Sequence, residues 1–261
     1  MNCALEDFIL PTQRKLFKRL CHEYGKKALY CKDNFILVRG EVPVLLVAHL
    51  DTVHAEPVKT ICKSADTDCI WMSPQGIGGD DRCGVYALAK VYALADQKPW
   101  LLFTCDEEIG GVGAKMFCLC HARKKLPPEL DELKFIIEVD RRGYKDAVYY
   151  DCVNPAFEEF ISWSDFKTAQ GSFSDISIIA PELGVAAVNL SCGYYNAHTL
   201  HEYIHCGELE ATIRKISVIV KAVIDPEMSI PRFEYCAVET LDDCDGYFDD
   251  WDYDDDLQDL K

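Results

Sequence analysis

Polar side chains stand directly after the most apolar segments of this chain. Residues 44–48, VLLVA, are a continuous apolar run typical of a strand buried on both faces, and His49 and Asp51 follow it. Two later apolar runs end in the same way: Asp106, Glu107 and Glu108 follow 101–105, and Asp140 follows 135–139. Ligand sites of open α/β sheets lie outside the carboxyl ends of the strands, so these side chains are candidates for one shared site.

Two more groups of polar residues belong with them. Asp80 and Asp81 follow the glycine-rich segment GIGG at 76–79, and the segment NAHTLHEYIH at 196–205 contains three histidines. Carboxylates that gather at one place raise one another's pKa and destabilise the fold unless positive charge compensates. The basic residues within the motifs are Arg82, Arg141 and Arg142. The sequence therefore predicts one or two bound metal ions, and imidazole with carboxylate ligands suits zinc, cobalt or manganese.

Alternating strands and helices position these groups. Apolar spacing predicts helices at about 12–24, 81–95, 155–163 and 208–223, and one that begins near 111. Strands are predicted at 28–31, 34–38, 44–48, 69–73, 100–105, 134–140, 147–151 and 184–190. Strands that are apolar throughout and alternate with helices indicate an α/β fold: a three-layer α/β/α sandwich with a mixed, largely parallel central sheet.

Composition and charge limit the class of protein. The chain has 261 residues, of which 49% are hydrophobic, enough for a sizeable core in one large α/β domain. Its formal net charge is −17, and ten of the residues 242–261 are Asp. We expect a single domain at 1–240 and an acidic, solvated tail at 241–261. This charge argues against nucleic-acid binding, which needs a basic face.

Neither a membrane span nor an export signal is expected. No apolar run reaches about 18 residues, and the N-terminal segment lacks the basic, apolar and small-residue order of a signal peptide. The 14 cysteines include no C-x-x-C pair, and a chain of this length does not need disulfides for stability. We therefore expect reduced thiols, mostly buried, in a cytoplasmic protein.

Taken together, the polar motifs resemble a known family. They are His-Leu-Asp-Thr-Val at 49–53, Gly-Gly-Asp-Asp-Arg-Cys-Gly at 78–84, Asp-Glu-Glu-Ile-Gly-Gly-Val-Gly-Ala at 106–114, the strand-end Asp140, and Asn-Ala-His-Thr at 196–199 followed by Glu202. In this order, across residues 40–205, they resemble the co-catalytic zinc peptidases. That clan includes leucyl-type and tetrahedral aminopeptidases and the tripeptidase and carboxypeptidase group. Each motif alone is common by chance, whereas five in order are specific.

The resemblance implies a site for two divalent metal ions, most simply zinc. Its ligands would be His49, Asp80, Glu108, Asp140 and His198. Asp80 would bridge the two metals, so each metal would also have one histidine and one further carboxylate. Asp51 would orient the His49 ring by accepting its other N–H, and Glu107 would act as the general base toward a water. The family pattern also implies a cis peptide bond between Asp80 and Asp81.

Structural roles stay open for the same residues. His49 alone could be a hydrogen-bonded core histidine, and Glu107 with Glu108 could be a solvated helix N-terminus. The pair at 80–81 could cap a helix, and Asp140 could be a turn residue.

The remaining histidines offer alternatives to one ligand. His201 or His205 could take the place of His198. We expect the others to be surface histidines: His22, His54 and His121. Asp175, in SFSDIS, resembles a turn near the site in the family, and we expect a structural role for it.

The spacing of the motifs bears on the reaction. The interval from Asp51 to Asp80 is too short for the small barrel of the tetrahedral branch, and that from Asp140 to His198 is too short for the lid and dimerisation domain of the carboxypeptidase branch. A site without a lid favours a metallo-aminopeptidase that releases N-terminal residues from peptides. An N-acyl amino acid deacylase of the same clan would use the same metals and base, and a metal-free binding protein is a third hypothesis. The sequence does not determine the oligomeric state.

Overall fold

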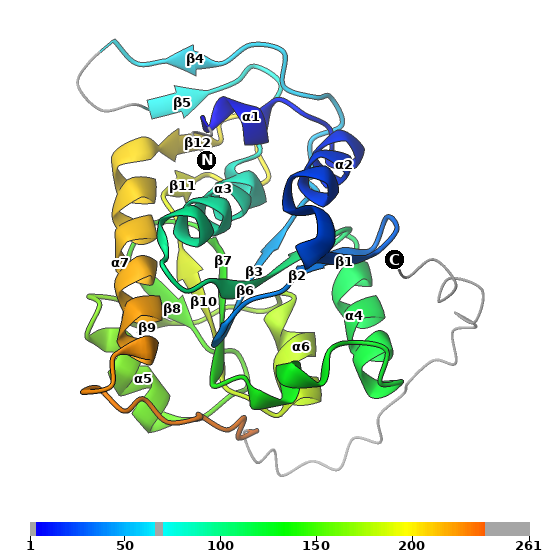
Figure 1. Ribbon diagram of the computed structural model, residues 1–261. Helices are drawn as coiled ribbons and strands as arrows, with labels where there is room; N and C mark the ends of the chain where they lie inside the picture. The colour runs from blue at the N-terminus through cyan, green and yellow to red at the C-terminus, as the bar shows by residue number, and fades with distance from the viewer. Residues whose placement is uncertain (1–3, 66–69, 238–261) are drawn as a thin grey trace, which may run out of the picture.

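The central sheet of the computed structural model has eight strands in the order β1-β2-β6-β3-β7-β10-β8-β9 (Figure 1). These strands are β1 (Ala28–Cys31), β2 (Phe35–Val38), β3 (Val42–His49), β6 (Pro99–Thr104), β7 (Phe135–Arg141), β8 (Asp146–Val148), β9 (Lys167–Ala169) and β10 (Ala187–Ser191). The neighbours β6, β3, β7 and β10 run parallel, as do β8 and β9, whereas the pairs β1–β2, β2–β6 and β8–β10 are antiparallel. The predicted mixed, largely parallel sheet is confirmed.

The structure describes residues 4–65 and 70–237, so the predicted acidic tail at 241–261 lies outside the described residues. A second, antiparallel sheet has the order β11-β12-β5-β4. Its strands are β4 (Cys62–Lys63), β5 (Ile70–Met72), β11 (Tyr194–Tyr195) and β12 (Tyr203–His205). This small sheet joins the interval 51–80 to the segment that carries the late histidines.

Helices cover both faces of the central sheet. They are α1 (Glu6–Ile9), α2 (Gln13–Tyr24), α3 (Gly79–Leu94), α4 (Val112–Ala122), α5 (Pro155–Ser162), α6 (Ile176–Leu183) and α7 (Cys206–Ile224), with short 3₁₀ turns at Gly25–Lys27 and Pro128–Glu132. Helices α3 and α7 pack side by side on one face, and α4 and α6 pack on the other (Figure 1). The arrangement is the three-layer α/β/α sandwich expected from the sequence.

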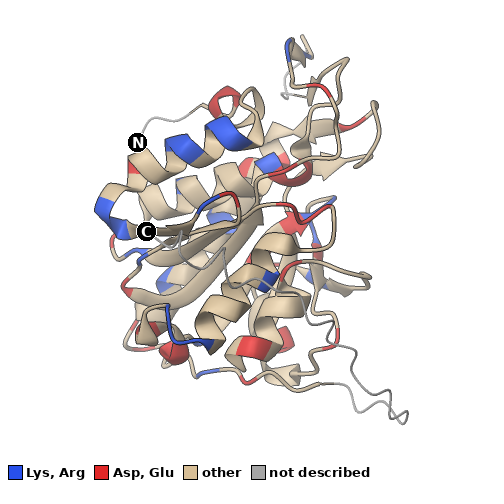
Figure 2. Ribbon diagram, turned by 90° about the vertical axis from the view of Figure 1, so that its right-hand side faces the viewer, with Lys and Arg blue, Asp and Glu red and all other residues tan. Residues whose placement is uncertain are grey.

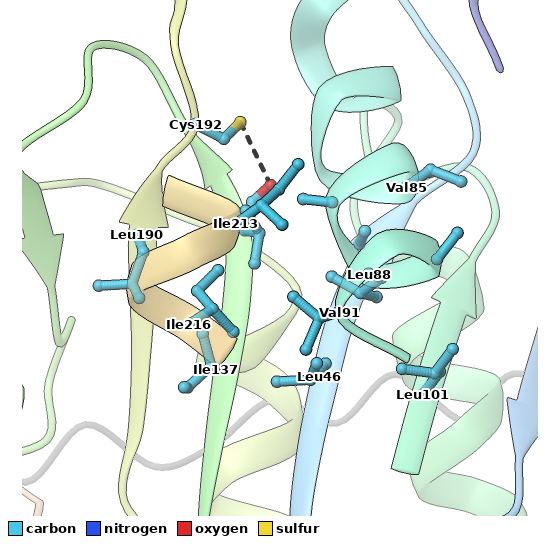
Figure 3. Packing of buried hydrophobic residues seen from close by; sticks show 14 of the residues in the cluster. Leu46, Val85, Leu88, Val91, Leu101, Ile137, Leu190, Cys192, Ile213 and Ile216 are labelled. Atoms are coloured by element: carbon cyan, nitrogen blue, oxygen red, sulfur yellow. Dashed lines mark hydrogen bonds between the residues drawn. The ribbon is translucent and has the colours of Figure 1, made fainter. Parts of the chain in front are cut away.

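The larger core lies between the sheet and the α3–α7 pair. Figure 3 shows Leu46 of β3 and Ile137 of β7 facing Leu88 and Val91 of α3 and Ile216 of α7. All five side chains are fully buried. Burying a side chain of this size contributes roughly 1.5–3 kcal/mol, so these contacts fix the position of α3 on the sheet.

Helix α6 was not predicted, for an identifiable reason. Its sequence, ISIIAPEL, contains Pro181, which removes a backbone donor and normally ends a helix. The helix forms because Ile176, Ile179 and Leu183 pack as one apolar face into the second core. Tertiary packing therefore overrides the local signal.

Acidic and basic residues are interspersed over the described elements (Figure 2). Exposed pairs such as Lys59–Glu56 at 2.8 Å contribute little because water screens them, so they do not determine the fold. Within residues 4–65 and 70–237, no helix combines the length and the apolarity needed to cross a membrane.

Gly84 sets the distance between α3 and β7, and its replacement tests this contact. A Cβ there would lie 2.0 Å from the Val139 carbonyl oxygen and 2.4 Å from Asp81 Oδ1. We expect Gly84→Ala to lower the free energy of unfolding by about 1–3 kcal/mol or more, measured by denaturant titration.

Gly207→Ala is the matched control, because its Cβ would meet only ordinary contacts of 3.4–3.6 Å with the His205 ring in the first turn of α7. That variant should have unchanged or slightly higher stability. Equal losses in the two variants would show that the close approach at Gly84 is unimportant.

Candidate metal centre

The polar residues predicted from the strand ends meet at one edge of the sheet. β3 lies between β6 and β7 and is parallel to both, so the three strands end together. His49 is the last residue of β3, and Asp140 is next to last in β7. Glu107 and Glu108 lie in the loop between β6 and α4.

His49 is the central imidazole of this edge. It is fully buried, and its Nδ1 lies 3.2 Å from Asp51 Oδ1. On the other side of the ring, Nε2 lies 3.2 Å from Asp80 Oδ1 and 3.6 Å from Asp140 Oδ1. Burial alone would lower the pKa of His49, but attraction by Asp140, Asp51 and Asp80 outweighs it and raises that pKa well above its usual value.

His198 forms a second, similar group around the other oxygen of Asp80. Its Nε2 lies 3.2 Å from Asp80 Oδ2 and 3.1 Å from Glu108 Oε1. Asp80 therefore offers Oδ1 to His49 and Oδ2 to His198. The structure brings all five predicted ligand residues together in two groups, His49 with Asp140 and His198 with Glu108, that share Asp80.

The two alternative histidines lie in other surroundings. His205 caps α7, where its Nδ1 accepts a hydrogen bond from Glu208 N at 3.2 Å. His201 is exposed. Of the three histidines in this segment, His198 alone pairs with Asp80 among the ion pairs of the described residues.

Asp51 fixes two parts of the site at once. Besides facing His49 Nδ1, its Oδ1 accepts a hydrogen bond from Glu107 N at 3.1 Å, and its Oδ2 accepts one from Glu108 N at 3.0 Å. The carboxylate thus holds the His49 ring and the backbone of the loop that carries Glu107 and Glu108. Burial raises the pKa of Asp51, but the hydrogen bond with His49 and the two N–H donors outweigh it and lower that pKa.

The Asp80–Asp81 peptide bond is cis, as the family pattern implied. The two carboxylates have different surroundings. Asp81 is fully buried and accepts hydrogen bonds from His49 N at 3.2 Å and from Gly84 N at 2.9 Å. Asp81 therefore takes the helix-capping role, and Asp80 alone faces both histidines.

Glu107 and Glu108 differ in what their carboxylates meet. Glu108 forms an ion pair with His198, whereas Glu107 forms no ion pair with a basic group among residues 4–65 and 70–237. Burial raises the pKa of Glu107. Burial and the nearby Asp80 raise the pKa of Glu108 to about 7. A carboxylate with a raised pKa beside a metal site has the properties of a general base.

The donor set fits divalent metals. Glu108 Oε1 is buried and has no hydrogen-bond partner in the described structure, although it lies 3.1 Å from His198 Nε2. Two arginines of the motifs hydrogen-bond elsewhere: Arg82 donates to the carbonyl oxygens of Phe8 and Pro11, and Arg141 donates to that of Gln170. One donor atom each from His49, Asp80 and Glu108 lies within 4.8 Å of the other two, a spacing compatible with metal binding.

Asp140 is part of a second set of three close donors, with His49 and Asp81. Burial and repulsion from Asp80 raise the pKa of Asp140 well above its usual value. We assign Asp80 rather than Asp81 to this group because both Asp81 oxygens already accept backbone N–H groups.

Three residues around the site were not predicted as part of it. Tyr194 donates a hydrogen bond to Asp140 Oδ1 at 3.0 Å. Glu202 is fully buried behind Asp80, and His54 binds it at 2.8 Å. The expectation that His54 is a surface histidine is wrong, because its side chain is only 8% exposed. The position of Glu202 in the last motif was a usable signal for it, whereas no local pattern marks Tyr194 or His54.

Asp175 lies beneath the loop that carries Glu107, as a structural residue would. It is fully buried, and Thr104 Oγ1 donates to its Oδ2. Burial raises the pKa of Asp175 to about 7. A Cβ on Gly111 would lie 3.3 Å from Asp175 Oδ1, so the carboxylate packs against the start of α4.

The sequence matches no protein-family model and no curated relative. Among solved structures, the chain is similar to aminopeptidase PepT from Bacillus cereus, with a TM-score of 0.64 and 15% identity over 84% of this chain and 96% of that one. A tripeptidase from Staphylococcus aureus matches with a TM-score of 0.61 and 16% identity, over 84% of this chain and 96% of the tripeptidase. A TET aminopeptidase from a marine sediment archaeon, Thaumarchaeota archaeon, matches with a TM-score of 0.60 and 14% identity, over 86% of this chain and 97% of that aminopeptidase. The chain therefore has the fold of these aminopeptidases.

Metal binding at this centre should release protons. The hydrogen bond with Asp80 raises the pKa of His198 to about 9, and burial raises that of Glu108 to about 7, so between pH 7 and 9 His198 holds the proton that a metal must displace. We expect the apparent affinity for zinc to rise about tenfold per pH unit between pH 7 and 9, one displaced proton being worth that factor. Calorimetry in buffers of different ionisation enthalpy measures the release.

The control for this prediction is His198→Gln, which removes the titrating ring. The His198→Gln variant should bind zinc more weakly than the unaltered protein, and its zinc affinity should change less between pH 7 and 9. An affinity of the unaltered protein that stays constant from pH 7 to 9 would contradict the assignment of His198 as a ligand.

Replacing Asp51 by Asn tests whether one carboxylate organises both parts of the site. An amide cannot accept from Glu107 N, Glu108 N and the His49 ring together, because its nitrogen is a donor. We expect metal affinity to fall about 10–100-fold. Asp106→Asn, at a neighbouring carboxylate that accepts from Gln13, is the control and should bind metal normally.

Proposed function

We propose that this protein is a metallo-aminopeptidase, a hydrolase that releases N-terminal residues from peptides with the help of two divalent metal ions. One observation carries the proposal. The two oxygens of Asp80 face two histidines, each of which has its own carboxylate partner, and an unpaired glutamate lies in the adjoining loop. A donor set divided in this way suits two cations that share a bridging carboxylate.

The proposed ligands divide into two sets. His49 and Asp140 would hold one ion, His198 and Glu108 the other, and Asp80 both. Two nitrogen and three carboxylate donors suit zinc, with cobalt or manganese as further candidates. The aminopeptidase fold supports this assignment by analogy.

When bound, the two ions would supply an activated water and polarise the carbonyl of the bond to be cleaved. The chain's own residues do the rest. Glu107, held by its backbone N–H on Asp51, takes a proton from the water and gives it to the leaving amine. Asp51 keeps the His49 ring in place during this exchange.

We propose that residues 1–240 form a single catalytic domain without a lid or dimerisation insertion. In the described residues, the interval after Asp51 contributes β4 and β5 to the small sheet, and the interval after Asp140 contributes β8, β9, β10, α5 and α6 to the main body. An open site of this kind suits the amino end of a peptide rather than a substrate whose terminal carboxylate a lid must recognise.

The proposed compartment is the cytoplasm. No disulfide joins the eleven cysteines within the described residues, and six of them are buried. Cysteines without disulfides suit a reducing environment, and burial raises the pKa of several of them, such as Cys105 and Cys192, which keeps them unreactive.

Substrate profiling of the zinc-loaded protein tests the reaction. We expect hydrolysis of aminoacyl-peptides with a free amino terminus and little hydrolysis of N-acyl amino acids. A preference for N-acyl substrates would establish the deacylase alternative. Metal binding without hydrolysis of either class would establish a binding protein.

Glu107→Gln and Glu108→Gln should separate proton transfer from metal binding. Replacing Glu107 keeps the side chain's shape and removes the base, so hydrolysis should fall by about 10²–10⁴-fold with metal content nearly unchanged. Replacing Glu108 should lower both metal content and rate, because it removes the carboxylate beside His198. Metal analysis and rates on one aminoacyl substrate measure both effects.

The reverse pattern would show that the two roles are exchanged. Full activity in both variants would refute the hydrolase assignment. Each variant serves as the control for the other, because the two residues are adjacent and the substitution is the same.

A further inference from the structure

The buried carboxylate of Glu202 accepts hydrogen bonds from the backbone of the loop that carries Asp80. Glu202 is 0% exposed, and its Oε1 accepts a hydrogen bond from Asp80 N at 2.9 Å. Its Oε2 accepts one from Gly78 N at 2.9 Å. The side chain thus holds two amides of the glycine-rich loop, one of them the amide of Asp80 itself.

His54 completes this arrangement from a distant part of the chain. Its Nε2 lies 2.8 Å from Glu202 Oε2. The ring also lies flat against Gly76, where a Cβ would come within 2.2 Å of its Cε1 and Nδ1 atoms. His54 therefore contacts the start of the loop directly and its end through Glu202.

Neither residue belongs to the proposed ligand set or to the proton-transfer step. A fully buried carboxylate is costly unless its oxygens are hydrogen-bonded, and Glu202 meets three donors: two backbone amides and the His54 ring. Loss of one donor leaves the carboxylate under-compensated, and the loop must then shift to bring in water. Any such shift turns the Asp80 side chain, whose two oxygens serve both halves of the site.

We propose that His54 and Glu202 form a positioning pair that aims Asp80 between the two metal sites, so that both metals are lost or weakened together when the pair is broken. The inference rests on the proposed two-metal function. It adds two residues whose effect on metal binding passes through the backbone of the glycine-rich loop.

Two substitutions of similar size test the pair. His54→Gln keeps a donor that can reach Glu202, whereas His54→Leu has none. Both side chains have room, because His54 borders a cavity of about 370 Å³ between the 51–58 loop and the N-terminal segment. We expect His54→Leu to weaken zinc binding at both sites by about 10–100-fold and His54→Gln to recover most of the affinity.

His121→Leu is the matched control. Both ring nitrogens of His121 also meet carboxylates, Glu182 at 2.9 Å and Asp131 at 3.1 Å, but at the end of α4 away from the metal centre. The His121→Leu variant should have a lower free energy of unfolding but normal zinc affinity. A His54→Leu variant with normal zinc affinity, or one that loses a single metal, would overturn the proposal.

Hydrogen exchange on the metal-free protein gives a second readout that depends neither on metal binding nor on activity. The amides of Gly78 and Asp80 should exchange slowly, because Glu202 accepts both, and His54→Leu should accelerate them without changing α7. Exchange of these amides at the rate of an unprotected loop in the unaltered protein would refute the pair. Zinc binding without peptide hydrolysis would instead refute the proposed function and leave this inference standing.

Discussion

Repulsion among buried carboxylates is the constraint that shapes this molecule around its site. Asp80, Glu108 and Asp140 gather at the carboxyl edge of the sheet, and their positive neighbours there are the imidazoles of His49 and His198. Burial, and after it repulsion from Asp80, raises the pKa of both Asp140 and Glu108. Divalent cations would relieve this repulsion, which is why a metal centre explains the cluster better than a structural role does.

A second set of carboxylates stabilises the loops that carry the first set. Asp51, Asp81 and Glu202 each accept hydrogen bonds from two backbone amides, and these bonds fix the loops that carry the site. Such charge-assisted bonds are stronger than neutral ones. The acidic residues therefore differ in their partners: Asp51, Asp81 and Glu202 bind backbone amides of the loops, whereas Asp80, Glu108 and Asp140 face His49 and His198.

The fold contributes the geometry through strand order. The parallel strands β6, β3 and β7 are neighbours, so residues far apart in the sequence emerge at one edge. The small sheet places His198 and Glu202 over the start of α3, since β11 and β12 flank them in the chain and β12 pairs with β5. The close approach of Gly84 to the Val139 carbonyl packs the start of α3 against β7.

The sequence by itself determined the main strands and the amphipathic helices, because continuous apolar runs and helical spacing are local patterns, and the order of its polar motifs indicated which residues lie together at the candidate centre. It did not reveal helix α6, whose Pro181 contradicts a helix until Ile176, Ile179 and Leu183 find a core to pack against. Nor did it reveal the two-residue strands of the small sheet, which are too short to show a period. Only the tertiary structure decided that the His54 side chain is mostly covered, since its partner Glu202 is 148 residues away and a hydrogen bond at that separation depends on how the sheets pair.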